Sequence, residues 1–361
     1  MPVEVKRGHL PDLSIVRLER DHAPEAAKLC AGALRRARRL DARLPAAGNA
    51  ARSLATAWAR RLADQNFAGF GAVVDGRLVG TLGASYRRLP EGSNEVVWSA
   101  RVGGWMPLAL AAVADGWPVA DVLAPLYRAV ADWLREQQVP LHFASAFSAD
   151  QETIRAWRDL GFRPQGILAL LDSEAVTALQ ARRPPAGVCL RVATPDDAHA
   201  VTALLIESHR IHAALPGSFY VAEDGERFYP DLVANELRYE QDEVHYLVAE
   251  EGRRIIGFAS STIREAMPGD LARYTEPLPL GYVDEVCVTA AARGRGIAAA
   301  LLAGLFPWFN AHNARDFGLH YIANNTAASA TWRRLGFRAL EMRLQGGPDP
   351  LRLALPEEVA L

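Results

Sequence analysis

The sequence lacks most of the features that place a protein outside the cytoplasm. It has only three cysteines, Cys30, Cys189 and Cys287, in 361 residues, too few and too scattered for a disulfide framework or a zinc cluster. The longest apolar stretch, Ile297 to Phe309, falls short of the roughly 18 residues of a membrane span. The amino terminus lacks the apolar run of a secretory signal. We therefore expect a cytoplasmic protein with no membrane partner and no bound metal.

The sequence also lacks a strong charge of either sign. Lysine and arginine number 40 against 42 aspartates and glutamates, for a net charge of -2, so nothing attracts the whole chain to nucleic acid. Half of the residues are hydrophobic and 23% are charged, a balance typical of globular proteins. At about 100–200 residues per domain, the length predicts two domains. We expect a monomer or homodimer that does not bind nucleic acid.

What the sequence does contain is an internal repeat. The segment AWRDLGFRPQG around Trp157 returns as TWRRLGFRALE around Trp332, about 175 residues later. Turn dipeptides with matching apolar flanks, Asp75-Gly76 and Glu251-Gly252, recur at nearly the same spacing. The proline-rich stretch ARRPPAG between the copies cannot continue a helix. We predict two copies of one domain, at residues 1–180 and 188–361, joined by a linker at 181–187.

Each copy alternates apolar strand patterns with helical ones. The order is a strand, an amphipathic helix, a hairpin, a further strand, a helix, a strand, a last helix and a closing Gly-Phe turn. Helices between strands favour an α/β fold in which helices flank a mixed central sheet. In the second copy, the helical run from Gly296 to about His312 contains Pro307, where we expect a kink or a break.

The strongest chemical signal is the turn Arg293-Gly294-Arg295-Gly296, which lies between a β-branched strand and an alanine-rich helix. Two glycines let the backbone approach a ligand closely, and the first turn of the helix offers free N–H groups and a positive dipole end. The arginines can add contacts to phosphate oxygens. No lysine of a P-loop follows, and no third glycine of a dinucleotide fingerprint is present. The pattern indicates a pyrophosphate site.

These residues resemble the GNAT superfamily of N-acetyltransferases. The acyl-CoA signature of that family, [Q/R]-x-x-G-x-[G/A], is matched by Arg293, Gly296 and Ala298. A second signature is matched downstream by Asn325, Ala328, Trp332, Gly336 and Phe337. Because the first copy shares the tail motif and the hairpin, the whole chain is similar to a tandem GNAT protein.

The resemblance implies acetyl-CoA as cosubstrate and assigns residues to it. The backbone of Val286, Cys287 and Val288 would bind the pantetheine arm, the amides from Gly294 to Ala299 the pyrophosphate, and Asn325 the region near the thioester. The expected cofactor-binding residues are Val286, Cys287, Val288, Arg293, Gly294, Arg295, Gly296, Ile297, Ala298, Ala299, Asn325, Ala328 and Trp332.

The first copy lacks these features. At the equivalent place it reads AAVADGWPVADVL, with no paired glycines, and Pro118 and Asp121 stand where N–H donors and positive charge are needed. Its counterpart of Asn325 is Asp150. A carboxylate repels phosphate, and proline has no N–H to donate. We predict that this degenerate copy binds no acyl-CoA and instead shapes or supports the site of the other.

Acetyl transfer to an amine requires a base, because an alkylamine is only about one part in a thousand deprotonated at pH 7. Glu285 and Asp284 are the candidates, and we favour Glu285. Neighbouring strand residues face opposite sides, so only one points into the cleft unless a bulge intervenes. Trp332 stands where many family members carry a tyrosine that protonates the thiolate. Tyr321 is therefore a candidate acid, with Tyr282 as another.

Together these features predict an N-acyltransferase whose second copy transfers an acetyl group directly to an amine, most simply that of a small molecule. Two alternatives stay open: a protein N-acetyltransferase, and a non-catalytic acyl-CoA sensor, which the loss of the tyrosine at Trp332 permits. His209 and His212, three residues apart on a predicted helix, are candidates for the acceptor pocket.

Overall fold

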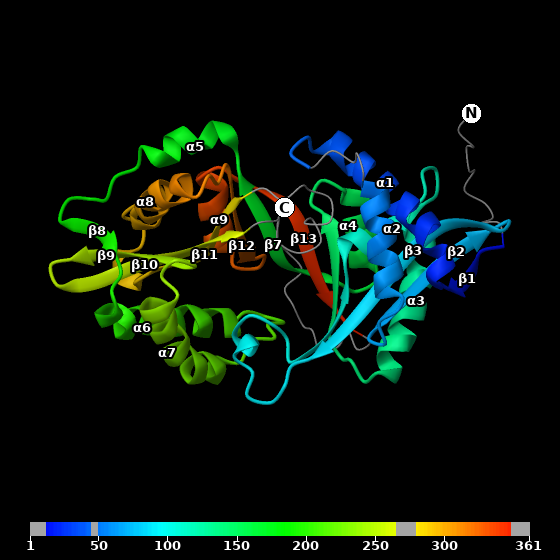
Figure 1. The fold of residues 1–361 in the computed structure, drawn as a ribbon, viewed down its shortest axis with the longest axis horizontal. Coiled ribbons are helices and arrows are strands. Elements are labelled where there is room, and N and C mark those ends of the chain that lie inside the picture. The colour runs from blue at the N-terminus through cyan, green and yellow to red at the C-terminus, as the bar shows by residue number, and fades with distance from the viewer. Residues whose placement is uncertain (1–11, 45–49, 265–278, 348–361) are drawn as a thin grey trace.

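The computed structural model describes residues 12–44, 50–264 and 279–347 (Figure 1). No helix within these ranges is long and apolar enough to cross a membrane. The helices are α1 (Ala23–Leu40), α2 (Ala50–Arg61), α3 (Val119–Glu136), α4 (Gln151–Asp159), α5 (Ser173–Gln180), α6 (Ala198–Ala213), α7 (Ala222–Tyr239), α8 (Ile297–Ala311) and α9 (Thr326–Arg334). The strands are β1 (Ser14–Arg17), β2 (Phe67–Val74), β3 (Arg77–Arg88), β4 (Val102–Met106), β5 (Ala111–Val113), β6 (His142–Phe147), β7 (Arg163–Leu171), β8 (Val188–Val192), β9 (Val244–Glu251), β10 (Arg254–Arg264), β11 (Leu280–Val288), β12 (Asp316–Ile322) and β13 (Phe337–Gly346).

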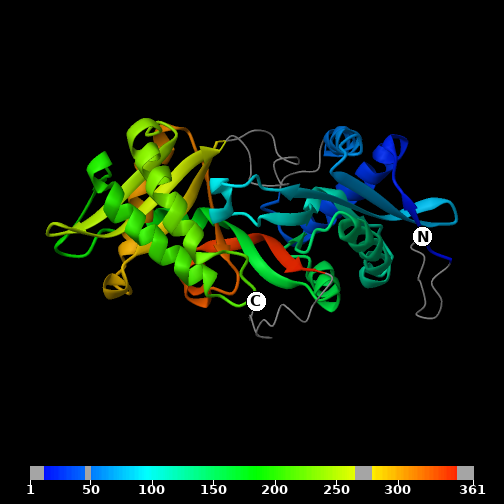
Figure 2. The same cartoon turned by 90° about the horizontal axis from the view of Figure 1, so that it is seen from below.

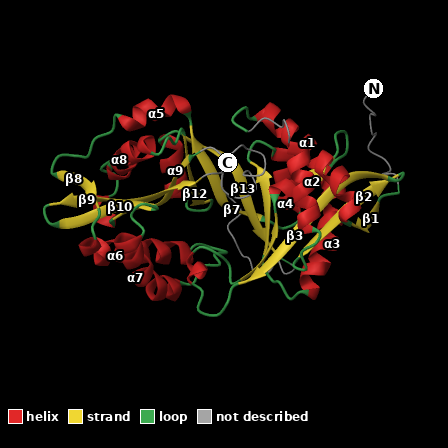
Figure 3. Ribbon diagram, in the orientation of Figure 1, coloured by secondary structure: helices red, strands yellow, loops and turns green. Residues whose placement is uncertain are grey.

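The two halves repeat one order of elements, with a second helix before each hairpin and a final strand that the sequence analysis did not predict. Each half runs strand, two helices, hairpin, strand, helix, strand, helix, strand, with short β5 added in the first half (Figure 3). The β2–β3 hairpin turns at Asp75 and Gly76, both with positive φ, the conformation that a tight two-residue hairpin requires. The predicted α/β fold with a mixed sheet and flanking helices is confirmed.

The halves share one continuous sheet because each gives its last strand to the other. Among the described residues, the strand order is β1-β2-β3-β4-β6-β13-β7-β12-β11-β10-β9-β8. Strand β13 of the second half lies between β6 and β7, and β7 of the first half lies between β13 and β12, all in antiparallel pairs. Figures 1 and 2 show β7 and β13 side by side at the centre of the molecule.

Because the two halves exchange strands, the predicted linker divides the sequence but does not divide the halves in space. As a division of the sequence, the boundary at 181–187 stays a prediction. In space, α5 precedes that boundary yet packs against α8 of the second half. The backbone of Gly336 lies so close to Ala175 of α5 that an added Cβ would sit 2.2 Å from the alanine methyl group. Each half therefore contributes elements that complete the other.

Helices cover both faces of the sheet. Helices α3 and α8 pack on one face in a core that runs through both halves and includes Leu126, Trp157 and Leu301. On the other face, α1 and α2 cover the first half in one core. Helices α6 and α7 cover the second half in another core. This other face carries the candidate active site.

Helix α8 does not break at its proline. It continues from Ile297 to Ala311 with Pro307 inside it, so the expected break does not occur. A proline within a helix costs about 3 kcal/mol through one lost hydrogen bond and a clash. Leu305, Phe306 and Phe309 on either side are almost completely buried, and burial of each such side chain contributes about 1.5–3 kcal/mol. Packing therefore outweighs the local cost.

The continuous sheet predicts that both halves unfold together. Leu344 of β13 is fully buried and pairs with Ala144 of β6 and Pro164 of β7. We expect Leu344→Ala to lower the free energy of unfolding by about 3 kcal/mol in a single urea transition, followed by circular dichroism and tryptophan fluorescence. The control Leu40→Ala, at a side chain that is 63% exposed, should change it by less than about 0.5 kcal/mol. Two separate transitions would contradict the shared sheet.

Candidate active site

The glycine turn is exposed and precedes a helix with free N–H groups. Gly294 and Gly296 have φ of 77° and 84°, and an added Cβ at either would meet no atom within 4 Å. The glycines are therefore needed for their backbone conformation and not for packing. Gly296 is the N-cap of α8, with no side chain capping it. The first amides of the helix thus remain available to an anion.

Both arginines of the turn hold carboxylates. Arg293 pairs with Glu207 of α6 at 3.0 Å, and its Nε donates to the Val288 carbonyl at 3.1 Å. Arg295 pairs with Glu251 at 2.6 Å. These side chains are substantially exposed, so the ion pairs are weak. A phosphate can therefore replace either carboxylate at little cost.

Strands β11 and β12 separate beside this turn. Their parallel pairing covers only Leu280–Val283 against Asp316–Leu319. Beyond it, β11 stays paired with β10 up to Val288, and β12 stays paired with β7 up to Ile322. The edge of β11 that faces β12, including Val286 and Val288, has no strand partner among the residues that the structure describes. An extended ligand that carries amides can pair with such an edge.

A β-bulge lies where the strands separate. Ser260 of β10 pairs with Glu285, but the next residue, Ser261, pairs with Val283, so Asp284 is the extra residue. The bulge interrupts the alternation that would send Asp284 and Glu285 to opposite faces. The neighbours of the two carboxylates, Val283 and Val286, pack in the core that contains α8, on the opposite face of the sheet. Both carboxylates therefore lie on the face that α6 and α7 cover.

The two carboxylates differ in their partners. Asp284 is bonded to Arg264 at 2.9 Å, and the Arg264 guanidinium lies 3.5 Å from the centre of the Tyr282 ring. Glu285 is half-buried with no hydrogen-bond or ion-pair partner among the described residues. Burial, with the charge of Asp284, raises the pKa of Glu285 to about 7. Burial also raises the pKa of Asp284, while Arg264 opposes the rise.

Further titratable groups surround this pair. Glu236 of α7 accepts a hydrogen bond from the Tyr246 hydroxyl, and burial raises the pKa of Glu236 to about 7. On β12, His320 bonds to Tyr282. Burial, with the charges of Arg343 and Arg264, lowers the pKa of His320. Cys287 is buried, and burial raises the pKa of its thiol, so it is a core residue and not an activated nucleophile.

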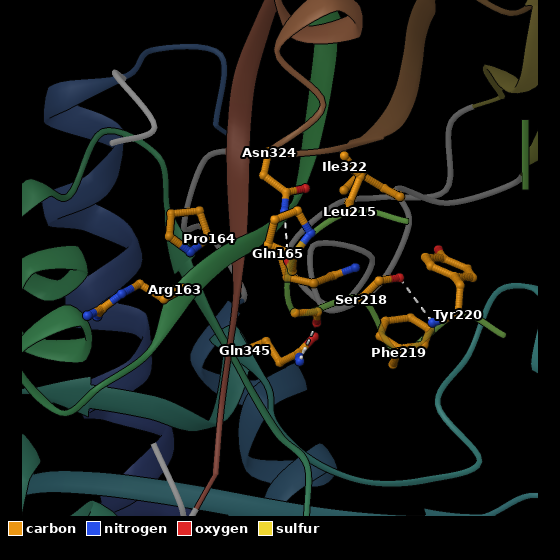
Figure 4. Close-up of a pocket in the computed structure, with 12 residues that line it drawn as sticks. Arg163, Pro164, Gln165, Leu215, Ser218, Phe219, Tyr220, Ile322, Asn324 and Gln345 are labelled. Atoms are coloured by element: carbon orange, nitrogen blue, oxygen red, sulfur yellow. Dashed lines mark hydrogen bonds between the residues drawn. The ribbon is translucent and has the colours of Figure 1, made fainter. Parts of the chain in front are cut away.

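The segment between α6 and α7 is held over the site by side-chain amides. Asn324 donates to the Pro216 carbonyl and Gln345 to the Gly217 carbonyl, both at 3.0 Å (Figure 4). The side chains of Asn324 and Gln345 line a hollow of about 320 Å³, a volume that includes space open to solvent. The amide oxygens of both residues, and that of Gln165 on β7, are buried without a hydrogen-bond partner in the part of the chain that the structure describes. They leave acceptors that water or a ligand can use.

The two histidines predicted for the acceptor pocket support this segment. His209 is only 2% exposed, and its Nε2 donates to the Val221 carbonyl at 2.8 Å. The Tyr229 hydroxyl lies 3.4 Å from the other ring nitrogen. Burial lowers the pKa of His212 to about 4. His209 thus fixes the end of the α6–α7 segment, where Tyr220 lies.

The predicted residues downstream of β12 have local roles. The Asn325 side chain caps α9 by accepting from the Ala328 amide at 3.1 Å, so the spacing of these two residues fits a helix cap. Trp332 is half-buried and packs edge-on against Phe337. Tyr321 packs in the core on the opposite face of β12 from His320, and burial raises its pKa. Contacts of these residues with acetyl-CoA stay predictions.

The first half has closed its equivalent region. Asp150 caps α4 through the Thr153 amide at 3.1 Å, as Asn325 caps α9. At the start of α3, Pro118 has no N–H, and the Val119 amide donates to Glu152 at 3.4 Å. Trp157 is fully buried, whereas its counterpart Trp332 is not. The absence of an acyl-CoA site at this helix stays a prediction.

The loop between β3 and β4 of the first half contacts the second half in two places. The Val96 and Val97 side chains, from the loop between β3 and β4, pack in the core beneath α6 and α7. In the same loop, Arg101 holds Asp224 of α7 with contacts of 2.5 and 2.7 Å. The first half therefore contacts the two helices beside the candidate site. That it supports the site stays a prediction.

Several site residues were missed by sequence reasoning. Arg264, Tyr220, His320 and Glu236 belong to no motif, and only the fold brings them near Asp284 and Glu285. A charged residue at the end of an apolar strand was the one available signal for Arg264. No group of three or more potential metal-ligating side chains occurs in the described ranges.

The comparisons agree with this geometry. Residues 208–337 match the model of the acetyltransferase (GNAT) family. The mycothiol acetyltransferase of Amycolatopsis mediterranei (strain U-32) is 34% identical over 126 residues, which span 35% of this chain and 40% of that protein. This chain therefore matches only two-fifths of the length of that relative.

Among solved structures, the GCN5-related N-acetyltransferase from Sphaerobacter thermophilus is similar over 94% of this chain and 97% of its own, with a TM-score of 0.54 and 17% identity. The tandem GNAT protein from the clavulanic acid biosynthesis pathway covers 94% of this chain and 99% of its own, with a TM-score of 0.49 and 16% identity. The first likeness extends the shared fold along nearly the whole chain. The C-terminal half of the chain thus contains a region, residues 208–337, that matches the GNAT acetyltransferase family.

Proposed function

We propose that this protein is an acetyl-CoA-dependent N-acetyltransferase whose C-terminal half carries the reaction, with Glu285 as the general base. One observation supports this proposal most directly. Where β11 separates from β12, three features of the described residues meet: the open glycine turn, the unpaired edge of β11 and the carboxylate of Glu285, which has no bonding partner there. The first half takes part only as a support for this site.

The chain's residues suit acetyl-CoA. The amides from Gly294 to Ala299 would hold the pyrophosphate at the helix N-terminus, and the edge of Val286 to Val288 would pair with the pantetheine arm. The open side of Trp332 would pack beside the arm. When bound, acetyl-CoA supplies an activated acetyl group.

Glu285 suits the role of base better than Asp284. A base works best when its pKa lies near the working pH, and the pKa of Glu285 is raised to about 7. Asp284 is already bonded to Arg264, so we assign it to positioning that arginine. Glu285 would accept the proton of the acceptor's ammonium group, directly or through water.

The thiolate of coenzyme A can leave with little help from an acidic side chain of the protein. A thiol with a pKa of about 8.5 leaves without a strong acid, and the indole of Trp332 cannot supply a proton. Tyr321, on the α9 side of β12, stays the proposed donor, with solvent as the other source.

The acceptor is proposed to be a small-molecule amine. The α6–α7 segment, anchored by Asn324 and Gln345, restricts the site on one side. The loop that ends at Arg101 supports it from the first half. A long, flat protein segment fits such a walled site less well than a small molecule does.

The glycine turn predicts the effect of a carboxylate placed on it. We expect Gly296→Asp to weaken acetyl-CoA binding at least about tenfold, because the side chain strains a residue with positive φ and repels phosphate. Titration calorimetry with acetyl-CoA measures the change.

Gly116 offers a matched control in the first half. Its φ is also 84°, and an added Cβ there would likewise meet no atom within 4 Å. Gly116→Asp should bind acetyl-CoA as the unaltered protein does. Normal binding by Gly296→Asp, or weakened binding by Gly116→Asp, would refute the placement of the cosubstrate.

The base assignment predicts a pH profile. Because the pKa of Glu285 is raised, this group is protonated and inactive as a base below about pH 7. The rate, kcat/KM, should therefore rise with pH through about 7 and level off above it. Glu285→Gln should lower kcat by about a hundredfold or more and remove this ionisation.

Thiol release from acetyl-CoA in the presence of an amine panel measures these rates. Glu243→Gln, at an exposed residue outside the cleft, should leave the profile unchanged. If Asp284→Asn removes the ionisation and Glu285→Gln does not, the base is Asp284 and our assignment is wrong.

A further inference from the structure

A second, larger hollow lies where the halves meet, on the same face as the carboxylates. It encloses about 1010 Å³, part of it open to solvent, and we call it the junction basin. Most of its lining belongs to the first half, but Arg343 comes from the exchanged strand β13. The lining residues that matter here are Arg61, Asp64, Arg87, Trp98, Trp105 and Arg343.

Two of the three arginines in the junction basin have no ion-pair partner within the described ranges, although the carboxylate of Asp64 also lines the basin. Arg87 is bonded to Glu95 at 2.8 Å. Arg61 and Arg343 are half-buried, and neither has a hydrogen-bond or ion-pair partner among the described residues. Partial burial of an unpaired guanidinium is costly. An anionic group bound there would offset that cost with charge-assisted, bidentate hydrogen bonds.

Aromatic rings surround these charges. Trp98 is 49% exposed, an unusual position for so large an apolar side chain. Trp105 is stacked on Phe143, with ring centres 5.5 Å apart, and Phe143 contacts Phe219 of the α6–α7 segment. The basin therefore offers apolar surface beside the free arginines, and its aromatic lining continues to the segment that covers the candidate active site.

Arg343 also links the junction basin to the catalytic end. It lies two residues before Gln345 on β13, on the same face, and Gln345 bonds to the α6–α7 segment. Burial, together with the charges of Arg343 and Arg264, lowers the pKa of His320, which is bonded to Tyr282 beneath Arg264. This face of the sheet thus carries the carboxylates of Asp284 and Glu285 at one end. At the other end it carries the guanidinium groups of Arg61 and Arg343, which have no ion-pair partner among the described residues.

We propose that the junction basin binds the anionic end of the acceptor, so that the substrate is an amine that also carries a carboxylate or phosphate group. The amine would reach Glu285 while the anion lies between Arg61 and Arg343. Trp98 and Trp105 would pack against the apolar part in between. This inference rests on the proposed function and names its substrate class.

The test is titration calorimetry with matched pairs of amines. One series holds ω-amino carboxylates of four to eight carbons, the second holds aminoalkyl phosphates, and the third holds alkylamines of equal length without an anion. We expect at least one anionic amine to bind at least tenfold more tightly than its alkylamine. Arg343→Gln and Arg61→Gln should each reduce that preference to below about threefold, while Arg52→Gln, at an exposed arginine on the same helix as Arg61, should retain it.

Thermal melting establishes whether each variant folds. If Arg343→Gln does not fold, Arg61→Gln is used to test the proposal. Equal binding of anionic and plain amines at every length, or a preference that survives both variants, would overturn the junction basin as a substrate site. Acetyl transfer is assayed separately. Arginine-dependent binding without any transfer would count against the proposed function alone, and transfer to plain amines without an anionic preference would count against this inference alone.

Discussion

The exchange of β7 and β13 is the constraint on which the rest of the structure depends. Backbone hydrogen bonds must be satisfied along the whole sheet, and here β13 completes the first half while β7 completes the second. The candidate active site lies beside this seam. Gln345 of β13 and Gln165 of β7 line the hollow beneath the α6–α7 segment, and Arg343 of β13 lines the junction basin. Neither half could form this surface without the other.

The degenerate half is explained by the same arrangement. Its helix α3 begins with Pro118 and an amide that bonds to Glu152, and Trp157 fills its interior. It nevertheless supplies a strand to the centre of the sheet and a loop that holds α7. The first half therefore has a structural role in the fold, and its proposed lack of a cosubstrate site does not remove that role.

The sequence predicted the repeated fold and the features that depend on near neighbours. The glycine turn, the strand before it and the helix after it follow from local conformation, and so does the capping pair Asn325 and Ala328. The exchange could not be predicted, because β7 and β13 have the same residue pattern whichever partner they take. The bulge at Asp284 depends on pairing register between β10 and β11. Arg264 and Arg343 belong to the site only through contacts between distant segments, and Pro307 shows tertiary packing overriding a local rule.

We propose that the second half of the duplicated fold retains the cosubstrate site and that the first half has lost it. The most direct measurement is the stoichiometry of acetyl-CoA bound to the full chain, by titration calorimetry, together with a crystal structure of the complex. The account predicts one molecule per chain, with its diphosphate on the amides after Gly294. Two molecules per chain, or a single one at the start of α3, would contradict it.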